Sequence, residues 1–130
     1  LVTTVTLDRE PIFKDWRLGR ILVQVLRYYQ HAAGTLCYVV MPDHLHWLAQ
    51  LKGPFSLAQV VGGVKGRSSS EIGRVLGRTG PVWQDGYHDR ALRSEEQLLP
   101  IARYIVANPL RAGLVEKIGD YPLWDAIWLE

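Results

Sequence analysis

Residues 35–51 constrain the fold more than any other part of this chain. Residues 35–41 form an apolar run that is typical of a β-strand, and Pro42-Asp43 interrupts it. Residues 44–51 then resume in a pattern that can alternate between the two faces of a strand. We therefore predict two strands separated by a short break, so the fold must contain a β-sheet.

Three further segments have the apolar period of an amphipathic helix. Ser56 can cap the second of them, and residues 94–97 have the form of a capping box before the third. The middle of the second is rich in glycine and serine, so we expect it to bend or open. Pro109 should end the third at about Asn108. The apolar stripes span residues 18–29, 57–75 and 98–105.

The remaining segments complete an α+β pattern. Residues 2–7 form a β-branched, strand-like run, and residues 81–92 suggest an extended segment with a turn near Asp85-Gly86. The tail, which includes Leu114, Tyr121 and Trp128, is too apolar for a disordered extension and should pack onto the domain. The order strand, helix, strand, strand, helix, strand, helix predicts an α+β sandwich with an antiparallel sheet and helices mainly on one face.

Composition limits the class of protein. A chain of 130 residues with 48% hydrophobic content can bury one core, so we expect a single domain spanning residues 1–130. No apolar run approaches the roughly 18 residues of a membrane span, and no leader precedes the first strand, so we expect a soluble cytoplasmic protein. Cys37 lies in an apolar run and is expected to be a small buried hydrophobe. A net charge of +2 is compatible with nucleic acid but too mild to indicate it.

His44 and His46 are the first candidate site residues. They are two positions apart, so in a strand both imidazoles project from one face. Such a pair can bind a metal ion through both rings, or the two histidines can be solvent-facing or hydrogen-bonded strand residues. The spacing alone does not decide between these alternatives.

Three blocks of sequence closely resemble the single-tyrosine HUH transposases, in particular the REP-associated tyrosine transposase branch. They are VVMPDHLHWL at residues 39–48, VWQDGYHDR at residues 82–90 and ARYIVANPLRAGLV at residues 102–115. The resemblance implies a ferredoxin-like or RRM-like core and a divalent metal, Mg²⁺ or Mn²⁺, on His44 and His46. It also implies a tyrosine that becomes covalently joined to the 5′ phosphate of cleaved DNA.

The third block supplies the remaining candidates for that chemistry. By resemblance Tyr104 is the nucleophile, with Tyr87 as the alternative, although an ordinary half-buried aromatic would have the same pattern. Tyr104 and Asn108 are four residues apart and share a helix face. In related enzymes a polar residue at that spacing, often a glutamine, completes the metal site. By this resemblance Asn108 is the expected third ligand, although its side chain is shorter than that of glutamine. Asn108 as a helix-end cap and His88 as the ligand remain alternatives.

Basic residues near the second and third blocks are candidates for DNA binding, although each could be an ordinary solvated charge. Asp43 could orient a histidine or simply form the turn with Pro42. For Trp47 and Trp83 we expect buried packing rather than stacking on bases. The candidate DNA contacts are Lys65, Arg67, His88, Arg90, Arg93, Arg103 and Arg111.

The resemblance implies a single-strand DNA endonuclease and strand transferase that acts at hairpin or REP-type repeats. The expected partner is single-stranded DNA that contains a hairpin, and no interaction with a membrane is expected. The chain could be a monomer or a homodimer. No phosphate-binding loop is evident, so no cofactor besides the metal is expected. Two other hypotheses remain open: a nucleic-acid-binding module that does not cleave, and a metal-dependent hydrolase in which water attacks the phosphodiester.

Overall fold

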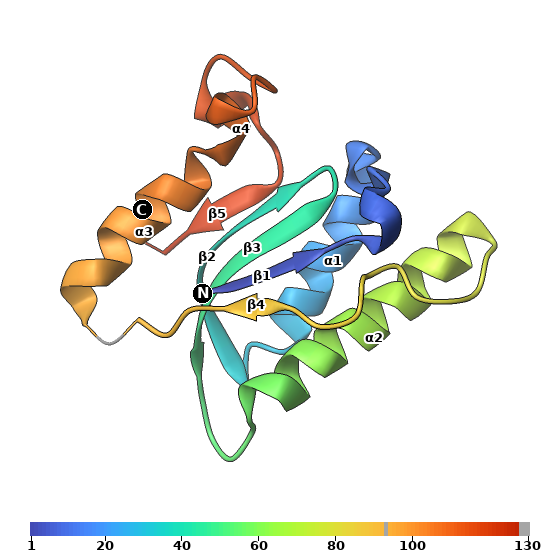
Figure 1. Cartoon of the computed structure of the whole chain (residues 1–130), viewed down its shortest axis with the longest axis horizontal. Helices are drawn as coiled ribbons and strands as arrows, with labels where there is room; N and C mark the ends of the chain where they lie inside the picture. Colours follow the sequence, from blue (N-terminus) through green and yellow to red (C-terminus); the bar gives the residue numbers. More distant parts are fainter. Residues whose placement is uncertain (93, 128–130) are drawn as a thin grey trace.

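The computed structural model describes residues 1–92 and 94–127, and in this part of the chain a five-stranded sheet is flanked by helices (Figure 1). Neighbouring strands are antiparallel and follow the order β4-β1-β3-β2-β5, so β3 is central. This confirms the predicted α+β class. Arg93 and Trp128 lie outside the described residues. The strands are β1 (Val2–Val5), β2 (Ala33–Met41), β3 (His44–Leu51), β4 (His88–Asp89) and β5 (Trp124–Ala126).

The predicted helices are present, with one correction. α1 (Trp16–Tyr28) and α2 (Leu57–Leu76) pack together, while α3 (Glu95–Val106) and the short α4 (Asn108–Arg111) contact β2 (Figure 1). The expected bend in α2 is wrong, since α2 is continuous over 20 residues. Its middle is held by the buried Ser68, whose hydroxyl donates to the Val64 carbonyl at 2.6 Å and accepts from the Trp83 indole at 2.9 Å. Among the described residues, no helix is long and apolar enough to cross a membrane.

The helix starts were predicted with mixed success. Ser56 and Gln59 form the complete capping box at the start of α2, which confirms the cap. Ser94 directly precedes α3 as expected, but its side chain makes no capping hydrogen bond. α3 ends at Val106, slightly before the predicted position, and α4 follows directly with Pro109 in its first turn, where a missing backbone N–H is tolerated.

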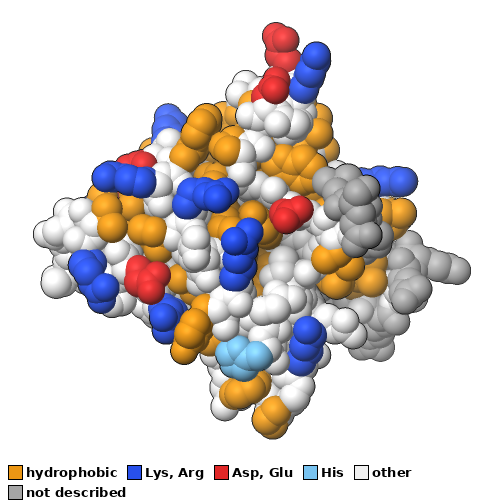
Figure 2. Space-filling model, turned by 180° about the vertical axis from the view of Figure 1, so that it is seen from behind, with side chains coloured by type: hydrophobic (Ala, Val, Ile, Leu, Met, Phe, Trp, Pro, Cys, Tyr) orange, Lys and Arg blue, Asp and Glu red, His pale blue; other side chains and the backbone are white. Residues whose placement is uncertain are grey.

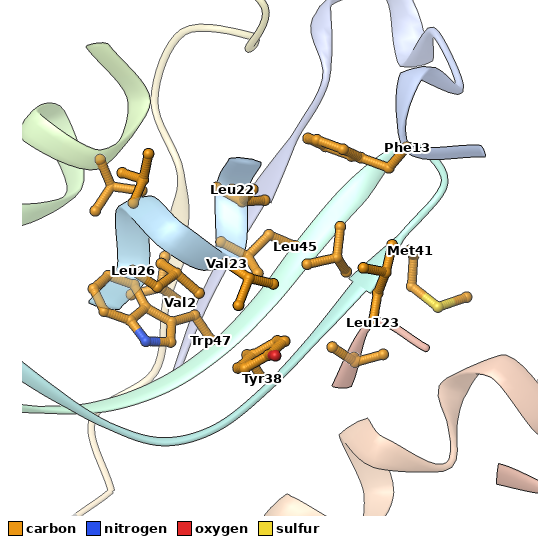
Figure 3. Close-up of a cluster of buried hydrophobic side chains, with 14 of the residues drawn as sticks. Val2, Phe13, Leu22, Val23, Leu26, Tyr38, Met41, Leu45, Trp47 and Leu123 are labelled. Atoms are coloured by element: carbon orange, nitrogen blue, oxygen red, sulfur yellow. The ribbon is translucent and has the colours of Figure 1, made fainter. Parts of the chain in front are cut away.

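The main core fills the space between α1 and one side of the sheet. Figure 3 shows Leu45 and Trp47 of β3 beside Leu22 and Leu26 of α1. Full burial of such side chains contributes roughly 1.5–3 kcal/mol each. The Trp47 indole donates to the Thr35 hydroxyl at 2.8 Å, so its buried N–H is satisfied. Because residues alternate along a strand, positions 44 and 46 of β3 project to the opposite side of the sheet.

Three expectations about buried groups are confirmed. Trp47 and Trp83 are packed in the interior, and Cys37 is fully buried. Burial raises the pKa of the Cys37 thiol to about 12, so this thiol stays protonated and unreactive. Cys37 and Val39 share the side of the sheet on which His46 lies, because they pair with Leu48 and His46 in register. Since α3 contacts β2 and buries its own Ala102 and Ile105, we infer that α3 covers part of this second side.

The break at Pro42-Asp43 is the turn of the β2–β3 hairpin, as predicted. Met41 pairs with His44 in register, so two residues make the turn. The Asp43 carbonyl accepts from the Thr6 backbone N–H at 2.9 Å, and the Pro42 carbonyl accepts from the Phe13 N–H at 3.0 Å. These bonds from outside the hairpin fix the turn and the start of β3.

The second sequence block runs along the edge of β1. The Leu7 N–H donates to the Val82 carbonyl at 2.8 Å, the Gln84 N–H donates to the Val5 carbonyl at 2.9 Å, and β4 then pairs with β1. The predicted turn near Asp85-Gly86 is confirmed by a left-handed Gly86 with φ of 76°. The second block therefore runs as an extended segment along the edge of the sheet.

The tail packs onto the domain, as expected, and adds an edge strand that the sequence pattern did not reveal. The Tyr121 hydroxyl donates to the Val40 carbonyl at 2.5 Å, and the Val40 N–H donates to the Leu123 carbonyl at 2.9 Å. Leu123 is fully buried against Gly19 of α1, where any Cβ would collide with its side chain. β5 then pairs with β2.

We predict that Leu123→Ala lowers the free energy of unfolding by about 2–5 kcal/mol, because it removes a fully buried side chain between α1 and β2. Urea denaturation followed by circular dichroism measures this change. Leu114→Ala, at a position that is 43% exposed, is the matched control and should change stability by no more than about 0.5 kcal/mol. Equal effects of the two substitutions would contradict docking of the tail.

Candidate functional site

The two histidines of β3 lie side by side on the side of the sheet that faces away from α1. Their ring centroids are 4.8 Å apart, with the ring planes nearly perpendicular at 83°. Both histidines are half-buried, and the His44 side chain is 18% exposed. The predicted common face is therefore confirmed.

His44 is oriented by the carboxylate that precedes it. Its Nδ1–H donates to Asp43 Oδ1 at 2.7 Å, and Asp43 Oδ2 accepts from Arg9 at 3.0 Å. Burial raises the pKa of Asp43, but the hydrogen bonds from His44 and Arg9 outweigh it and hold the pKa below its usual value. The ionised carboxylate fixes the proton of His44 on Nδ1 and leaves the lone pair of Nε2 for a ligand. Asp43 thus orients the histidine as well as forming the turn.

His46 is positioned by Thr3, its neighbour across β1. Its Nδ1 is 2.9 Å from the Thr3 hydroxyl, which is its register partner. Burial lowers the pKa of His46 to about 4, and the nearby charges of His44 and Arg111 act in the same direction. The ring is therefore neutral at physiological pH, and in the tautomer that donates Nδ1–H to Thr3 its Nε2 carries a free lone pair.

Two residues that support the histidines were not identified from the sequence. Thr3 faces His46 only because β1 and β3 pair in one particular register. Arg9 reaches Asp43 from a short turn in which both Asp8 and Arg9 have positive φ, 55° and 51°. Non-glycine residues at positive φ cost on the order of 1–2 kcal/mol each, and no periodic pattern marks such a turn.

The third sequence block places an exposed tyrosine against a basic side chain. Tyr104 lies on α3 and is 64% exposed, and the Arg111 guanidinium lies 3.8 Å from the centre of its ring. The charge of Arg111 also contributes to the lowering of the pKa of His46.

Asn108 and His88 differ in their relation to this group. Asn108 is half-buried at the start of α4, and no hydrogen bond among the described residues uses its side-chain amide, so it does not serve as a helix-end cap. His88 is exposed on β4 opposite Thr3. No three His, Cys, Asp or Glu side chains within residues 1–92 and 94–127 come together as metal ligands, so His88 does not join His44 and His46.

The donor set fits a divalent cation. Two neutral imidazole nitrogens are presented on one side of the sheet, each oriented through a hydrogen bond at its other nitrogen. An amide oxygen from Asn108 would add a third neutral ligand. Such ligands bring no negative charge, so the full charge of the ion would act on a bound phosphate.

The other basic candidates are not gathered on one face. Arg103 is exposed on α3 with Tyr104, whereas Lys65 and Arg67 belong to α2. The Lys65 ammonium donates to the Gln84 and Gly86 carbonyls, both at 2.6 Å, and so ties the second block to α2. Arg90 follows β4, and its carbonyl accepts from the amino group of Leu1 at 2.8 Å.

Comparisons with known proteins bear on the family and the fold of this chain. Residues 2–108 match the family described as Transposase IS200 like. A protein named as a REP-associated tyrosine transposase, from Haemophilus influenzae, is 25% identical over 109 residues, which cover 76% of this chain and 61% of that protein. The chain thus spans about three fifths of the length of that curated relative.

Two solved structures share the fold. The structure of a REP-associated tyrosine transposase bound to a REP hairpin matches with a TM-score of 0.74 and 20% identity, over 95% of this chain and 72% of that one. A crystal structure named as that of a transposase from Deinococcus radiodurans R1 matches with a TM-score of 0.58 and 22% identity, over 80% and 85% of the two chains. At these identities the two structures support the fold alone.

We predict that His44→Ala and His46→Ala each weaken Mn²⁺ binding by more than about tenfold, because each removes an oriented nitrogen donor. Isothermal titration calorimetry measures the affinity. His31→Ala, which removes a histidine elsewhere on the surface, is the control and should bind Mn²⁺ as the wild type does. If Asn108→Ala binds Mn²⁺ as the wild type does, Asn108 is not the third ligand. Unchanged Mn²⁺ affinity in both His44→Ala and His46→Ala would contradict the metal site.

Proposed function

The chain belongs to the IS200-like transposase family, and on this premise we propose that it is a single-strand DNA endonuclease and strand transferase with Tyr104 as its nucleophile. The observation that carries the proposal is the Arg111 guanidinium, which lies 3.8 Å from the centre of the exposed Tyr104 ring and whose charge contributes to the lowered pKa of His46. These two relations support a site that combines a phenol, a cation and two imidazoles.

The proposed step exchanges one phosphodiester for another. The Tyr104 oxygen attacks a DNA phosphorus and forms a new O–P bond, while the bond from phosphorus to the 3′ oxygen breaks. The phenol loses its proton and the departing 3′ oxygen gains one, so the products are a 5′-phosphotyrosine and a free 3′ hydroxyl. Because the ester bond is retained, a DNA 3′ hydroxyl can later reverse the step without ATP.

The residues around Tyr104 suit this step. A phenol is a poor nucleophile until it loses its proton. The Arg111 guanidinium lies over the Tyr104 ring, 3.8 Å from its centre. The same guanidinium can donate to a phosphate oxygen as negative charge develops on it. A divalent ion, Mg²⁺ or Mn²⁺, held by His44, His46 and Asn108 would polarise a phosphate oxygen as a Lewis acid.

The relatives suggest the substrate class. One is named as a REP-associated tyrosine transposase, and the solved structure with the same fold is bound to a REP hairpin. We therefore propose that this chain acts on single-stranded DNA that contains a hairpin, next to REP-type repeats. Exposed Arg103 and Arg111 flank Tyr104 and can meet the phosphates on either side of the cut.

We predict that Tyr104→Phe lowers strand cleavage by at least roughly a thousandfold while hairpin affinity changes little, because only one exposed hydroxyl is lost. Labelled hairpin DNA and Mn²⁺ on a denaturing gel measure both the cut and the protein-linked product. Tyr87→Phe is the matched control and should cleave as the wild type does. Cleavage without a protein-linked species, retained in Tyr104→Phe, would instead indicate a hydrolase that uses water.

We predict that Arg111→Gln slows formation of the covalent product by on the order of a hundredfold, because it removes the cation beside the phenol. Single-turnover kinetics at saturating DNA isolate this step from binding. Arg103→Gln, at an exposed position on the same segment, serves as the control and should affect mainly the affinity for DNA. Equal single-turnover rates for wild type and Arg111→Gln would contradict this role for Arg111.

A further inference from the structure

A second group of aromatic side chains lies where α1 ends and α2 begins. Tyr28 ends α1, Tyr29 and His31 follow it, and Phe55 precedes α2. Ring centroids are 5.2 Å apart for Tyr28 and Tyr29, 6.3 Å for Tyr28 and His31, and 6.0 Å for His31 and Phe55. We call these four residues the aromatic patch.

The aromatic patch is open to solvent and carries a cation. Tyr28 is 54% exposed and Phe55 is 43% exposed. The Arg67 guanidinium of α2 lies 3.7 Å from the centre of the Tyr28 ring, and Arg67 Nε is 3.4 Å from Glu71 Oε1. Exposed aromatic rings and guanidinium planes are the surfaces on which unpaired nucleic-acid bases stack, whatever the base.

The segment around the patch carries more basic than acidic residues. From residue 15 to residue 71 the acidic residues are Asp15, Asp43 and Glu71, which pair with Arg17, with Arg9 and His44, and with Arg67 respectively. Figure 2 shows both basic and acidic side chains scattered among hydrophobic ones on the face seen from behind. The basic residues of this stretch are Arg17, Arg20, Arg27, Lys52, Lys65 and Arg67.

Near the patch, α2 carries three glycines and so has few side chains on its surface. A Cβ at Gly63 would lie 2.5 Å from the Tyr29 hydroxyl, so packing explains this glycine. At Gly62 and Gly66 a Cβ would meet nothing within 4 Å, although glycine within a helix is destabilising relative to alanine. No contact among the described residues therefore requires glycine at these two positions. The absence of a side chain there would allow the backbone of a ligand to approach the helix closely.

The patch and the histidine pair lie at opposite ends of β3. β3 runs from His44 near one end of the sheet to Leu51 near the other, a length of about 24 Å at the rise of a strand (Figure 1). This is about the length of seven stacked base pairs. A ligand of the patch would be a different part of the same DNA.

We propose that the aromatic patch binds unpaired bases of the DNA substrate, such as those in a hairpin loop, away from the site of cleavage. Tyr28 and Phe55 stack on the bases, and Arg67 contacts the adjoining phosphates. The inference rests on the proposed function, because it takes single-stranded DNA to be the ligand.

The test uses a fluorescent DNA hairpin with a loop of four thymines and a blunt duplex with the same stem. Fluorescence anisotropy should show that Tyr28→Ala and Phe55→Ala weaken hairpin binding by roughly five- to hundredfold, with duplex binding unchanged. Trp16→Ala is the matched control, since Trp16 is 57% exposed on the same helix but outside the patch. Unchanged hairpin affinity, or equal losses for hairpin and duplex, would overturn the proposal.

A second variant separates binding from folding. Gly66→Gln places a good helix former at an open position, so it should raise the melting temperature while it weakens hairpin binding. Covalent product formation on the hairpin-containing substrate at saturating concentration should be unchanged in Tyr28→Ala. If the wild type forms this product and the patch variants bind the hairpin normally, the patch proposal alone fails. If the wild type forms no product but Tyr28→Ala loses the hairpin, the proposed catalysis fails and the patch stands.

Discussion

The alternation of side chains along β3 is the constraint on which the rest of the molecule depends. Leu45 and Trp47 enter the core against α1, so His44 and His46 must project from the other side of the sheet. A shift of one residue in register would bury both imidazoles and expose the indole. The forces that stabilise the fold therefore also place the two rings, and the bonded Pro42-Asp43 turn fixes where the alternation begins.

Arg111 joins the histidine side of the sheet to the helix that carries Tyr104. Its guanidinium can stack on the phenol and influence His46 because the chain continues after α3 through the short α4. Pro109 lies in the first turn of α4, where its missing backbone N–H is tolerated. The tyrosine and the imidazoles thus come from separate elements, and we expect small shifts of the third block to alter the proposed reaction more than the fold.

The sequence predicted the elements and the histidine face because both follow from local periodicity. The hairpin at residues 35–51, the capping box at Ser56 and the packed tail all have local signals. Thr3 and Arg9 could not be found in this way, since their contacts depend on strand register and on a strained turn. The glycine- and serine-rich middle of α2 remains helical, and its Ser68 bonds to Val64 and Trp83, the second a long-range contact that composition does not reveal.

The most direct test of the account is the identity of the residue that becomes joined to DNA. Wild-type protein would be incubated with single-stranded hairpin DNA and Mn²⁺, digested with protease and nuclease, and analysed by peptide mass spectrometry. The account predicts one modified peptide, with a 5′-phosphate-linked nucleotide on Tyr104. A nucleotide on Tyr87 or on any other residue, or cleaved DNA with no modified peptide, would contradict it.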